Sequence, residues 1–503
     1  MHEWNKDSVE ALEEFHKAAQ LDPSNEGLVV EVTRRWFLSK KPDRALEILK
    51  LAAAQPDATA MLDVLLGTAY FQMGRTNLAI ESNQRAIKKA PRFLAGYQNL
   101  NLNHIQEGRT DEAIKVLDSA SRQRDVDADF LIGLAELYVN LAASVPSTKT
   151  NAHPKALALL ARAESMTITN IQSRIRLADG FNVLGQPDKA AKLYQEMLAD
   201  FPQAPMLQEN LRAKLTDIYL RGKDRKRAIE QLEAITKSDS MNLQAHYYLA
   251  MLSAEAGDSA KAEEHYRVVI VLNPKFEQAY YDLATAQLGT GKTNEVFRTL
   301  QDAQKRFGEN FVSEFLLGVA YARVGKYAEG VKHYNSAEII ARATDAKRLT
   351  PLFYFQYGSA LERKGDYTES VKYFEKALEL KPDFYEAANY LGYMWAERGE
   401  NLERAKELIE RAIKAEPKNN AYLDSMAWVL FKLGKPREAL PIMQQAVELA
   451  EAEKERDATL FDHLGDILMA LGEREKAHDA WRNALSLGPN EEILKKLEKS
   501  VTP

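Results

Sequence analysis

The chain has 503 residues, of which 45% are hydrophobic and 28% charged, as in a globular protein that can bury a core. Its formal net charge of -6 argues against nucleic acid as the main partner, because binding phosphates needs concentrated Lys and Arg. The absence of cysteine excludes disulfides, thiolate catalysis and cysteine-ligated zinc. No run of about 18 apolar residues occurs, so we expect no membrane-spanning segment.

The first predicted element is a lone amphipathic helix between Asp7 and Pro23, with Ala11, Phe15 and Ala18 on one face. Everything after it comes as helix pairs, so this helix predicts half a unit with an exposed apolar face. Two interpretations remain open. Either the chain continues upstream, with a further repeat and an export signal that could tether it to a membrane, or the residues around Trp4 cap the end.

Thirteen pairs of amphipathic helices follow, each about 34 residues long. We predict them over 26–57, 60–93, 94–126, 127–169, 171–204, three regular units between 209 and 309, and then 311–343, 351–384, 385–419, 420–450 and 458–490. The unit over 420–450 is expected to end in an elongated charged helix that continues through 451–456. A polar-faced helix over 491–500 is expected to close the array, as solubility requires at the end of a stack of repeats.

The unit over 351–384 shows the pattern most clearly. Its first helix carries one apolar face, which consists of Tyr354, Tyr357, Gly358 and Leu361. A turn at Gly365 separates it from a second helix, whose face is formed by Val371, Phe374, Ala377 and Leu378. Pro382 then ends the second helix, because a proline nitrogen cannot continue the hydrogen-bonding pattern. Neither helix can bury its apolar face alone, so each unit must pack on units of the same kind.

The positions of the two glycines, Gly358 and Gly365, recur along the chain. The position of Gly358 is held by Gly67, Asn101, Ala135, Ala178, Thr216, Ala250, Ala284, Gly318, Gly392, Ala427 and Gly465. The turn position of Gly365 is held by Gly74, Gly108, Gly185, Gly222, Gly257, Gly291, Gly325, Gly399, Gly434 and Gly472.

Two insertions interrupt the repeats. Residues 142–154 are rich in Ser, Thr, Pro and Asn and predict a loop, and residues 344–350 predict a second, basic loop. These insertions divide the chain into three predicted blocks, 1–140, 155–343 and 351–503. We interpret them as tolerated surface loops, with hinges or additional contact loops as the alternative.

No motif predicts catalysis. Residues 286–293, AQLGTGKT, come close to a phosphate-binding loop, but Ala286 replaces its first glycine and no strand precedes it. The nine histidines form no metal-ligand cluster, and His246 and His265 are expected to pack between paired helices. We therefore predict a protein that is not an enzyme and has no cofactor, catalytic residue or metal site.

The closing proline recurs as Pro91, Pro202, Pro274, Pro417 and Pro489. Together, the recurring small residue, turn glycine and closing proline resemble the tetratricopeptide repeat family over nearly the whole chain. The resemblance implies an all-α solenoid, a right-handed superhelix in which the first helix of each unit lines a concave ligand face. Some family members bind chaperone C-termini through a clamp of Lys and Asn, and others carry an asparagine ladder for sugar transfer. Both patterns are absent here, which disfavours these two functions.

On that concave face, the position of Phe355 is aromatic in four consecutive units, and further aromatic residues follow along the same groove. The predicted ligand groove comprises Tyr247, Tyr281, Phe315, Phe355, Asn389, Tyr393, Trp428 and Phe431. Such a stripe suits a helix or an extended segment with apolar anchors. The alternative is that these side chains pack between neighbouring first helices and bind nothing.

Upstream, three successive units place a carboxylate in the position of Ser359, namely Glu136, Asp179 and Asp217. These residues could form an acidic patch. Arg176, Lys214 and Arg221 lie near them in the sequence, so the favoured interpretation is a solvated surface that neutralises itself.

We therefore predict a protein-binding scaffold or adaptor that holds a peptide or protein segment in its groove. The C-terminal half resembles large bacterial repeat proteins, many of them envelope-associated lipoproteins, which favours a periplasmic or outer-membrane-associated role in assembly or export over a cytoplasmic one. The alternatives are a regulatory or substrate-positioning module of a larger enzyme complex and a carbohydrate-binding groove. The sequence does not identify the partner or the oligomeric state.

Overall fold

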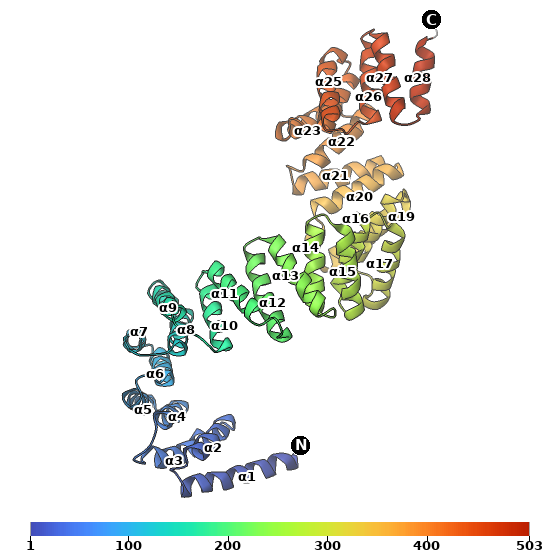
Figure 1. The fold of residues 1–503 in the computed structure, drawn as a ribbon. Helices are drawn as coiled ribbons and strands as arrows, with labels where there is room; N and C mark the ends of the chain where they lie inside the picture. The colour runs from blue at the N-terminus through green and yellow to red at the C-terminus, as the bar shows by residue number, and fades with distance from the viewer. Residues whose placement is uncertain (1, 502–503) are drawn as a thin grey trace. The chain divides into compact units, whose positions relative to one another are not determined.

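The computed structural model describes residues 2–501, and side chains are described for residues 10–499. This part of the chain consists of α-helices joined by turns and two single-turn 3-10 helices, with no strand (Figure 1). By its internal packing the chain divides into two units, Met1–Ser240 and Met241–Pro503. The division into three blocks remains a prediction.

The first unit holds α1 (His2–Leu21), α2 (Glu26–Leu38), α3 (Pro42–Ala53), α4 (Ala60–Gln72), α5 (Thr76–Lys89), α6 (Leu94–Gln106), α7 (Thr110–Ser121), α8 (Ala128–Ser144), α9 (Lys149–Glu164), α10 (Ile171–Val183), α11 (Pro187–Asp200), α12 (Pro205–Arg221) and α13 (Arg225–Ser238).

The second unit holds α14 (Leu243–Glu255), α15 (Ser259–Leu272), α16 (Glu277–Gly289), α17 (Thr293–Phe307), α18 (Phe311–Arg323), α19 (Tyr327–Thr344), α20 (Pro351–Lys364), α21 (Tyr367–Leu380), α22 (Tyr385–Arg398), α23 (Leu402–Ala415), α24 (Asn420–Lys432), α25 (Pro436–Ala452), α26 (Ala458–Ala470), α27 (Arg474–Leu487) and α28 (Glu491–Val501).

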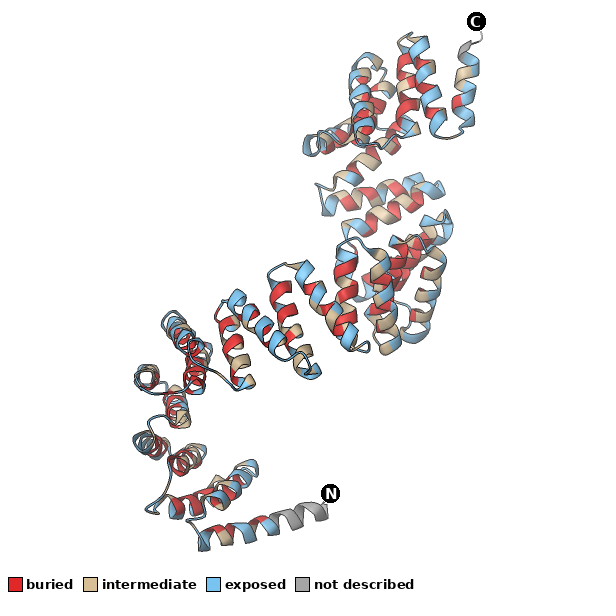
Figure 2. Ribbon diagram, in the orientation of Figure 1, coloured by how far each residue is buried: buried red, intermediate tan, exposed pale blue. Residues whose placement is uncertain are grey.

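The helices from α2 to α27 form thirteen consecutive antiparallel pairs within the described chain, which confirms the predicted all-α solenoid of helix pairs. Each first helix packs on its own second helix, and within each unit first helices of successive pairs also touch, as α22, α24 and α26 do. Buried residues therefore line the surfaces where helices meet (Figure 2). Each pair depends on its neighbours to cover its apolar faces.

The pair α20–α21 confirms the pattern predicted for 351–384. Phe374 of α21 is fully buried and packs beside Gly358 of α20, where an added Cβ would lie 3.1 Å from the ring. The Ser370 hydroxyl donates a hydrogen bond to the Gly358 carbonyl (2.8 Å), which the close helix approach makes possible. Gly365 ends α20 with φ of 91°, a left-handed conformation that favours glycine.

The predicted turn at Gly222 is an exception. Gly222 has φ of -77°, and the left-handed position after α12 is taken instead by Lys223, with φ of 59°. The sequence spacing located the turn correctly but assigned the positive φ to the wrong residue. In the left-handed region, with positive φ, a non-glycine residue is sterically strained, whereas glycine is not.

The prediction of a loop over 142–154 is wrong. Helix α8 continues to Ser144, a 3-10 turn spans Pro146–Thr148, and α9 begins at Lys149 and runs through Pro154. The insertion lengthens both helices of the pair, because Leu141, Ala142, Ala152 and Ala156 bury their side chains between them.

The prediction that 451–456 extends a helix is also wrong beyond Ala452, where α25 ends. The second insertion is a short connection at 345–350 with a single 3-10 turn, as predicted.

Helix α1 is a half unit, but its buried face is displaced by one residue from the predicted one. Leu12, His16 and Ala19 are buried, whereas Phe15 is 47% exposed. His16 accepts a hydrogen bond from the Trp36 indole nitrogen (3.1 Å), and this contact fixes which face of α1 meets α2. The side chain of Trp4 lies outside the described residues.

Helix α28 closes the array as predicted. Ile493 is buried against α27, and Lys496 bridges Asp462 and Asp466 of α26 (2.7 and 2.8 Å). Within residues 2–501 the helices are too short or too polar for any of them to traverse a lipid bilayer.

Candidate functional site

The predicted groove residues all lie on first helices of the second unit. Tyr247, Tyr281, Phe315 and Phe355 lie on α14, α16, α18 and α20, Asn389 and Tyr393 on α22, and Trp428 and Phe431 on α24. Six of them are half-buried, whereas Tyr281 and Trp428 are 4% and 5% exposed. The six half-buried residues leave part of their surface available, and the other two contribute to the packing beneath it.

Tyr247 and Tyr281 are held by polar partners as well as by packing. The Tyr247 hydroxyl donates to Asp282 of the next first helix (3.2 Å), and its ring packs on Phe276. The Tyr281 hydroxyl donates to Glu277 (2.8 Å) and accepts from Asn310 (2.6 Å). Burial, together with the Glu277 carboxylate, raises the pKa of Tyr281 to about 12. Both phenols are therefore fixed in orientation before any ligand binds.

Phe315 and Phe355 lie at the junctions between successive helix pairs. Phe315 packs on Phe311 of its own helix and on Phe353 of α20 (ring centroids 5.9 Å apart in both cases). Phe355 contacts Phe384 in the following turn and Tyr390 of α22 (5.3 and 5.8 Å). These contacts support the interpretation in which the stripe joins neighbouring pairs, but they leave both phenylalanines only half-buried.

The end of the stripe contains a cluster that sequence reasoning did not anticipate. The buried His463 of α26 lies 2.8 Å (Nδ1 to Oδ1) from Asp424 of α24 and stacks on Trp428, with ring centroids 3.9 Å apart. The Trp428 indole nitrogen donates to Glu397 of α22. In the sequence, His463 is one of nine scattered histidines, and its contact with Asp424, 39 positions away, has no local signal.

Asn389 and Tyr393 complete this end of the groove on α22. The ring of Tyr393 lies 6.0 Å from that of His463, and burial, followed by the charges of Glu397 and Asp424, raises the pKa of Tyr393 well above its usual range. The side-chain oxygen of Asn389 is buried and lacks a hydrogen-bond partner among the described residues. Such an acceptor is costly unless a ligand or water supplies a donor.

The three predicted patch carboxylates lie in the first unit, and each has a basic partner. The pairs are Glu136 with Arg176 (2.8 and 2.6 Å), Asp179 with Lys214 (2.7 Å) and Asp217 with Arg221. The first two pairs connect α8 to α10 and α10 to α12, so the charges join successive first helices. This arrangement agrees with a surface that neutralises itself.

The same geometric relationship recurs in both units. In each case two side chains of successive helix pairs meet. The first is the residue that follows the small-residue position (that of Gly358) in one pair, and the second lies two positions before the small-residue position in the next pair. Thr68 with Asn99, Glu136 with Arg176, Asp179 with Lys214 and Trp428 with His463 all obey it. The stacking of helix pairs therefore creates a fixed row of cross-unit contacts, and the residue types decide whether each contact is polar, ionic or aromatic.

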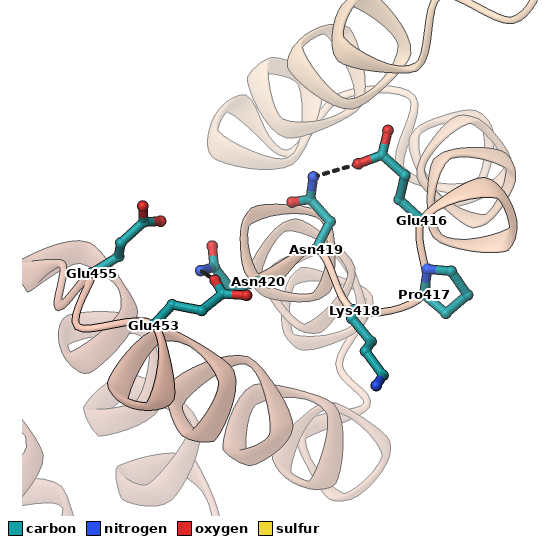
Figure 3. A pocket seen from close by; sticks show the side chains of 7 residues that line it. All are labelled: Glu416, Pro417, Lys418, Asn419, Asn420, Glu453 and Glu455. Atoms are coloured by element: carbon teal, nitrogen blue, oxygen red, sulfur yellow. Dashed lines mark hydrogen bonds between the residues drawn. The ribbon is translucent and has the colours of Figure 1, made fainter.

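Cavities lined partly by charged residues lie at several junctions between pairs in the described chain. One of about 150 Å³ lies between α8 and α10, where Glu136, Arg176 and Asp179 adjoin the exposed Val183. Two others lie at the turns that join successive pairs. One of about 790 Å³ is lined by Arg92, Arg122 and Arg124, and one of about 580 Å³ is lined by Glu416, Glu453 and Glu455 (Figure 3).

The residues that resembled catalytic motifs have structural roles. Gly291 lies in the turn after α16, so a helix precedes it where a phosphate-binding loop needs a strand, and Lys292 pairs with Glu263 (3.0 Å). His246 and His265 pack between α14 and α15, as predicted, and their Nδ1 atoms lie 3.0 Å apart. Among the described residues, His, Asp and Glu form no group that could hold a metal ion.

Comparison with known families agrees with this architecture. Models described as tetratricopeptide repeat match residues 214–275, 311–383, 355–420 and 421–453, and a PPR repeat model matches residues 176–200. The chain is a tetratricopeptide repeat protein. The family assignment accounts for the recurring pairs and for the small residue at each close helix approach.

Curated relatives match this tetratricopeptide repeat chain over part of their length. It is 26% identical over 226 residues to TPR repeat-containing protein PA4667 of Pseudomonas aeruginosa, covering 44% of this chain and 36% of that protein. It is 23% identical over 221 residues to antiviral innate immune response effector IFIT1 of Homo sapiens, covering 40% and 43%. The chain thus spans less than half the length of either relative.

Two solved structures align with most of this chain at low TM-scores. The Cut9–Hcn1 hetero-tetramer of the APC/C matches at 13% identity with a TM-score of 0.44, covering 93% of this chain and 95% of that one. Yeast Tom70 matches at 15% identity with a TM-score of 0.35, covering 93% and 97%.

Proposed function

We propose that this protein is a protein-binding scaffold that holds a peptide or protein segment along the first helices α14 to α24. The observation that carries the proposal is the half-buried state of Tyr247, Phe315 and Phe355, which occupy the same position on α14, α18 and α20. Aromatic neighbours hold each ring in place, and part of each side chain remains exposed. Rigid aromatic side chains of this kind contribute much of the energy at protein interfaces.

The preferred ligand is a segment with apolar anchors spaced to meet successive first helices. The polar groups that accompany the aromatics give it orientation. The buried acceptor of Asn389 and the carboxylate of Asp282, whose pKa is raised by burial, both favour hydrogen-bond donors on the ligand. Backbone amides of an extended segment would supply such donors.

The test compares two exposed leucines of one helix pair. Leu352 on α20 is 52% exposed and lies on the predicted groove side, whereas Leu380 on α21 is 56% exposed. A phage-displayed peptide library is selected against the intact chain, and the selected peptides are then titrated against Leu352→Glu, Leu380→Glu and Phe355→Ala. We expect Leu352→Glu and Phe355→Ala to weaken binding at least tenfold and Leu380→Glu to leave it unchanged.

Equal binding by all variants would contradict the groove assignment. Selected peptides that bind only outside the Met241–Pro503 unit would also contradict it. Titration with oligosaccharides in parallel addresses the carbohydrate alternative, because aromatic rings also stack on sugars. Binding of an oligosaccharide that Phe355→Ala removes, without any peptide binding, would replace the proposal with that alternative.

We also propose a bacterial envelope setting in which the scaffold supports assembly or export, with a regulatory module of a larger enzyme complex as the alternative. The resemblance of the C-terminal half to large bacterial repeat proteins supports the envelope setting. The similarity to a repeat protein of Pseudomonas aeruginosa supports only the bacterial part of the proposal. Fractionation of the native organism, with immunodetection of the chain, tests it. Recovery with the cytoplasmic fraction, in complex with an enzyme, would favour the alternative.

A further inference from the structure

The cavity of about 790 Å³ in the first unit is built by two neighbouring turns. One turn joins α5 to α6 and contributes Arg92 and Phe93, and the other joins α7 to α8 and contributes Arg122, Arg124 and Asp125. We call this cavity the arginine pocket. It lies at the edge of the stacked pairs and contains none of the groove residues, so inferences about it do not depend on the proposed function.

Among the described residues, two of the three guanidinium groups in the arginine pocket have no hydrogen-bond or ion-pair partner. Arg92 pairs with Asp125 (3.2 Å), but both side chains are mostly exposed, so the pair is weak. In the described part of the chain, neither Arg122 nor Arg124 makes a side-chain hydrogen bond or ion pair. Each of these exposed groups presents five donors in a fork that fits a carboxylate.

The nearest other carboxylate does not neutralise the pocket. Burial of Asp118 of α7 opposes its charged form, but hydrogen bonds from Lys155 (2.6 Å) and Tyr138 (2.5 Å), followed by the charges of Lys155 and Arg122, lower its pKa. Asp118 is therefore already bound by two partners other than the pocket arginines. A further arginine adds to the positive edge, since Arg162 of α9 donates to the Ser121 carbonyl (3.3 Å) beside Arg122. The pocket is thus locally basic in a chain whose net charge is -6.

The repeat fold does not require basic residues at these turns. The equivalent turns of the second unit, which follow α23 and α25, enclose a cavity of about 580 Å³ whose charged lining is three glutamates, Glu416, Glu453 and Glu455, and one lysine, Lys418 (Figure 3). Arg122 adjoins a helix C-terminus, where a cation is favourable for a structural reason. Arg92 and Arg124 lie beyond the helix ends, where that reason does not apply.

We propose that the arginine pocket binds an acidic peptide segment of a partner protein. Its carboxylates pair with Arg122 and Arg124, and an adjacent apolar side chain rests on Pro91 and the half-buried Phe93. A polyanion such as a nucleic acid fits less well, because the turns at 54–59 and 165–170 contain no Lys or Arg to continue a basic track. A short acidic segment needs only the one pocket.

The test uses the intact chain and a fluorescein-labelled peptide of sequence EDFDEE, with QNFNQQ as the uncharged equivalent. The variants are Arg122→Glu/Arg124→Glu and Arg122→Lys/Arg124→Lys. The matched control is Arg34→Glu/Lys50→Glu, which makes the same change in net charge at exposed sites on α2 and α3. All four substituted positions carry solvent-exposed side chains, and circular dichroism checks that helix content is preserved.

We expect EDFDEE to bind the native chain and the control equally, at least tenfold more weakly to the double Glu variant, and with intermediate affinity to the double Lys variant. Binding should weaken as NaCl rises from about 50 to about 300 mM, because exposed charges are screened. Equal binding of QNFNQQ, or an unchanged affinity in the double Glu variant, would overturn the proposal. Tighter binding of a single-stranded oligonucleotide at the same arginines would replace the acidic segment with a nucleic acid.

Discussion

The imidazole of His463 lies face to face with the indole of Trp428, with ring centroids 3.9 Å apart and planes inclined by 14°. The two residues come from neighbouring first helices, α26 and α24. Asp424 fixes the imidazole through Nδ1, and Glu397 of α22 accepts from the indole nitrogen. Three consecutive units are therefore joined at one point by stacking and by hydrogen bonds, under the end of the predicted groove.

Replacing Trp428 with alanine should loosen these three units. A buried tryptophan truncated to alanine costs about 3–5 kcal/mol, from lost burial and from the cavity left behind. Trp428→Phe should cost less, because it keeps a ring against His463 and loses the hydrogen bond to Glu397 and only part of the buried volume. Long repeat arrays need not unfold in one step, so hydrogen exchange of α22, α24 and α26 is the measurement of choice.

The control for this prediction is Leu487→Ala on α27, since Leu487 is 40% exposed and should tolerate truncation. Amide exchange in α22, α24 and α26 at the native rate in Trp428→Ala would show that the stack contributes little. A native rate only in α22 would show that the Glu397 contact does not transmit the effect.

The small-residue position should tolerate alanine unequally among units. At Gly465 an added Cβ would overlap the indole of Trp481, whereas at Gly358 it would lie 3.1 Å from Phe374. We expect Gly465→Ala to destabilise the last pair by about 1–3 kcal/mol, as overpacking does. Gly358→Ala should cost less. Chemical denaturation followed by tryptophan fluorescence measures both.

A compensating change separates overpacking from other causes. Leu300 occupies the position of Trp481 in the unit that has Ala284 in the position of Gly465. The double variant Gly465→Ala/Trp481→Leu should therefore show a smaller loss than the sum of its two single variants. Strict additivity of the two losses would argue against direct overlap between these side chains.

Acid should destabilise the first unit through His104. Burial, followed by the charge of Arg109, lowers the pKa of His104 below its ordinary value, so the folded chain binds fewer protons than the unfolded chain. Stability is then unaffected above the unfolded-state pKa of about 6.5 and falls as the pH decreases through and below it. The fall ends at the folded-state pKa, where both states are protonated.

His104→Tyr tests this prediction, because Tyr70 and Tyr138 hold the same position in the neighbouring units. The urea midpoint is compared between about pH 7.5 and pH 5.5, and each variant is compared with itself across this range. We expect a shallower decrease in His104→Tyr than in the native chain, and no change of slope in a His153→Gln control. A steeper decrease in His104→Tyr would reverse the assignment.

The ion pair between Glu136 and Arg176 should contribute little to stability, because both side chains are about two-fifths exposed (43% and 41%). A double-mutant cycle with Glu136→Gln and Arg176→Gln should give a coupling energy of about 0.2–1 kcal/mol that decreases with added salt. A much larger, salt-independent value would indicate that the patch has a role beyond neutralising itself.

The sequence by itself determined the repeat architecture. The spacing of Gly358, Gly365 and Pro382, repeated along the chain, fixed the number of helix pairs, because helix periodicity, turn conformation and proline geometry are local properties. Local signals failed at Gly222, at the insertion over 142–154 and at the face of α1. In each of these places, contacts with other helices or the exact turn residue decided the outcome.

Only the tertiary structure decided how the groove residues are used. The sequence placed Tyr281 and Trp428 in the stripe but could not show that both are buried, since burial depends on neighbouring pairs. It also could not bring together Asp424 and His463, 39 residues apart, or the turns that form the arginine pocket. Such contacts arise from the stacking of one helix pair on the next, a relationship that no short stretch of sequence encodes.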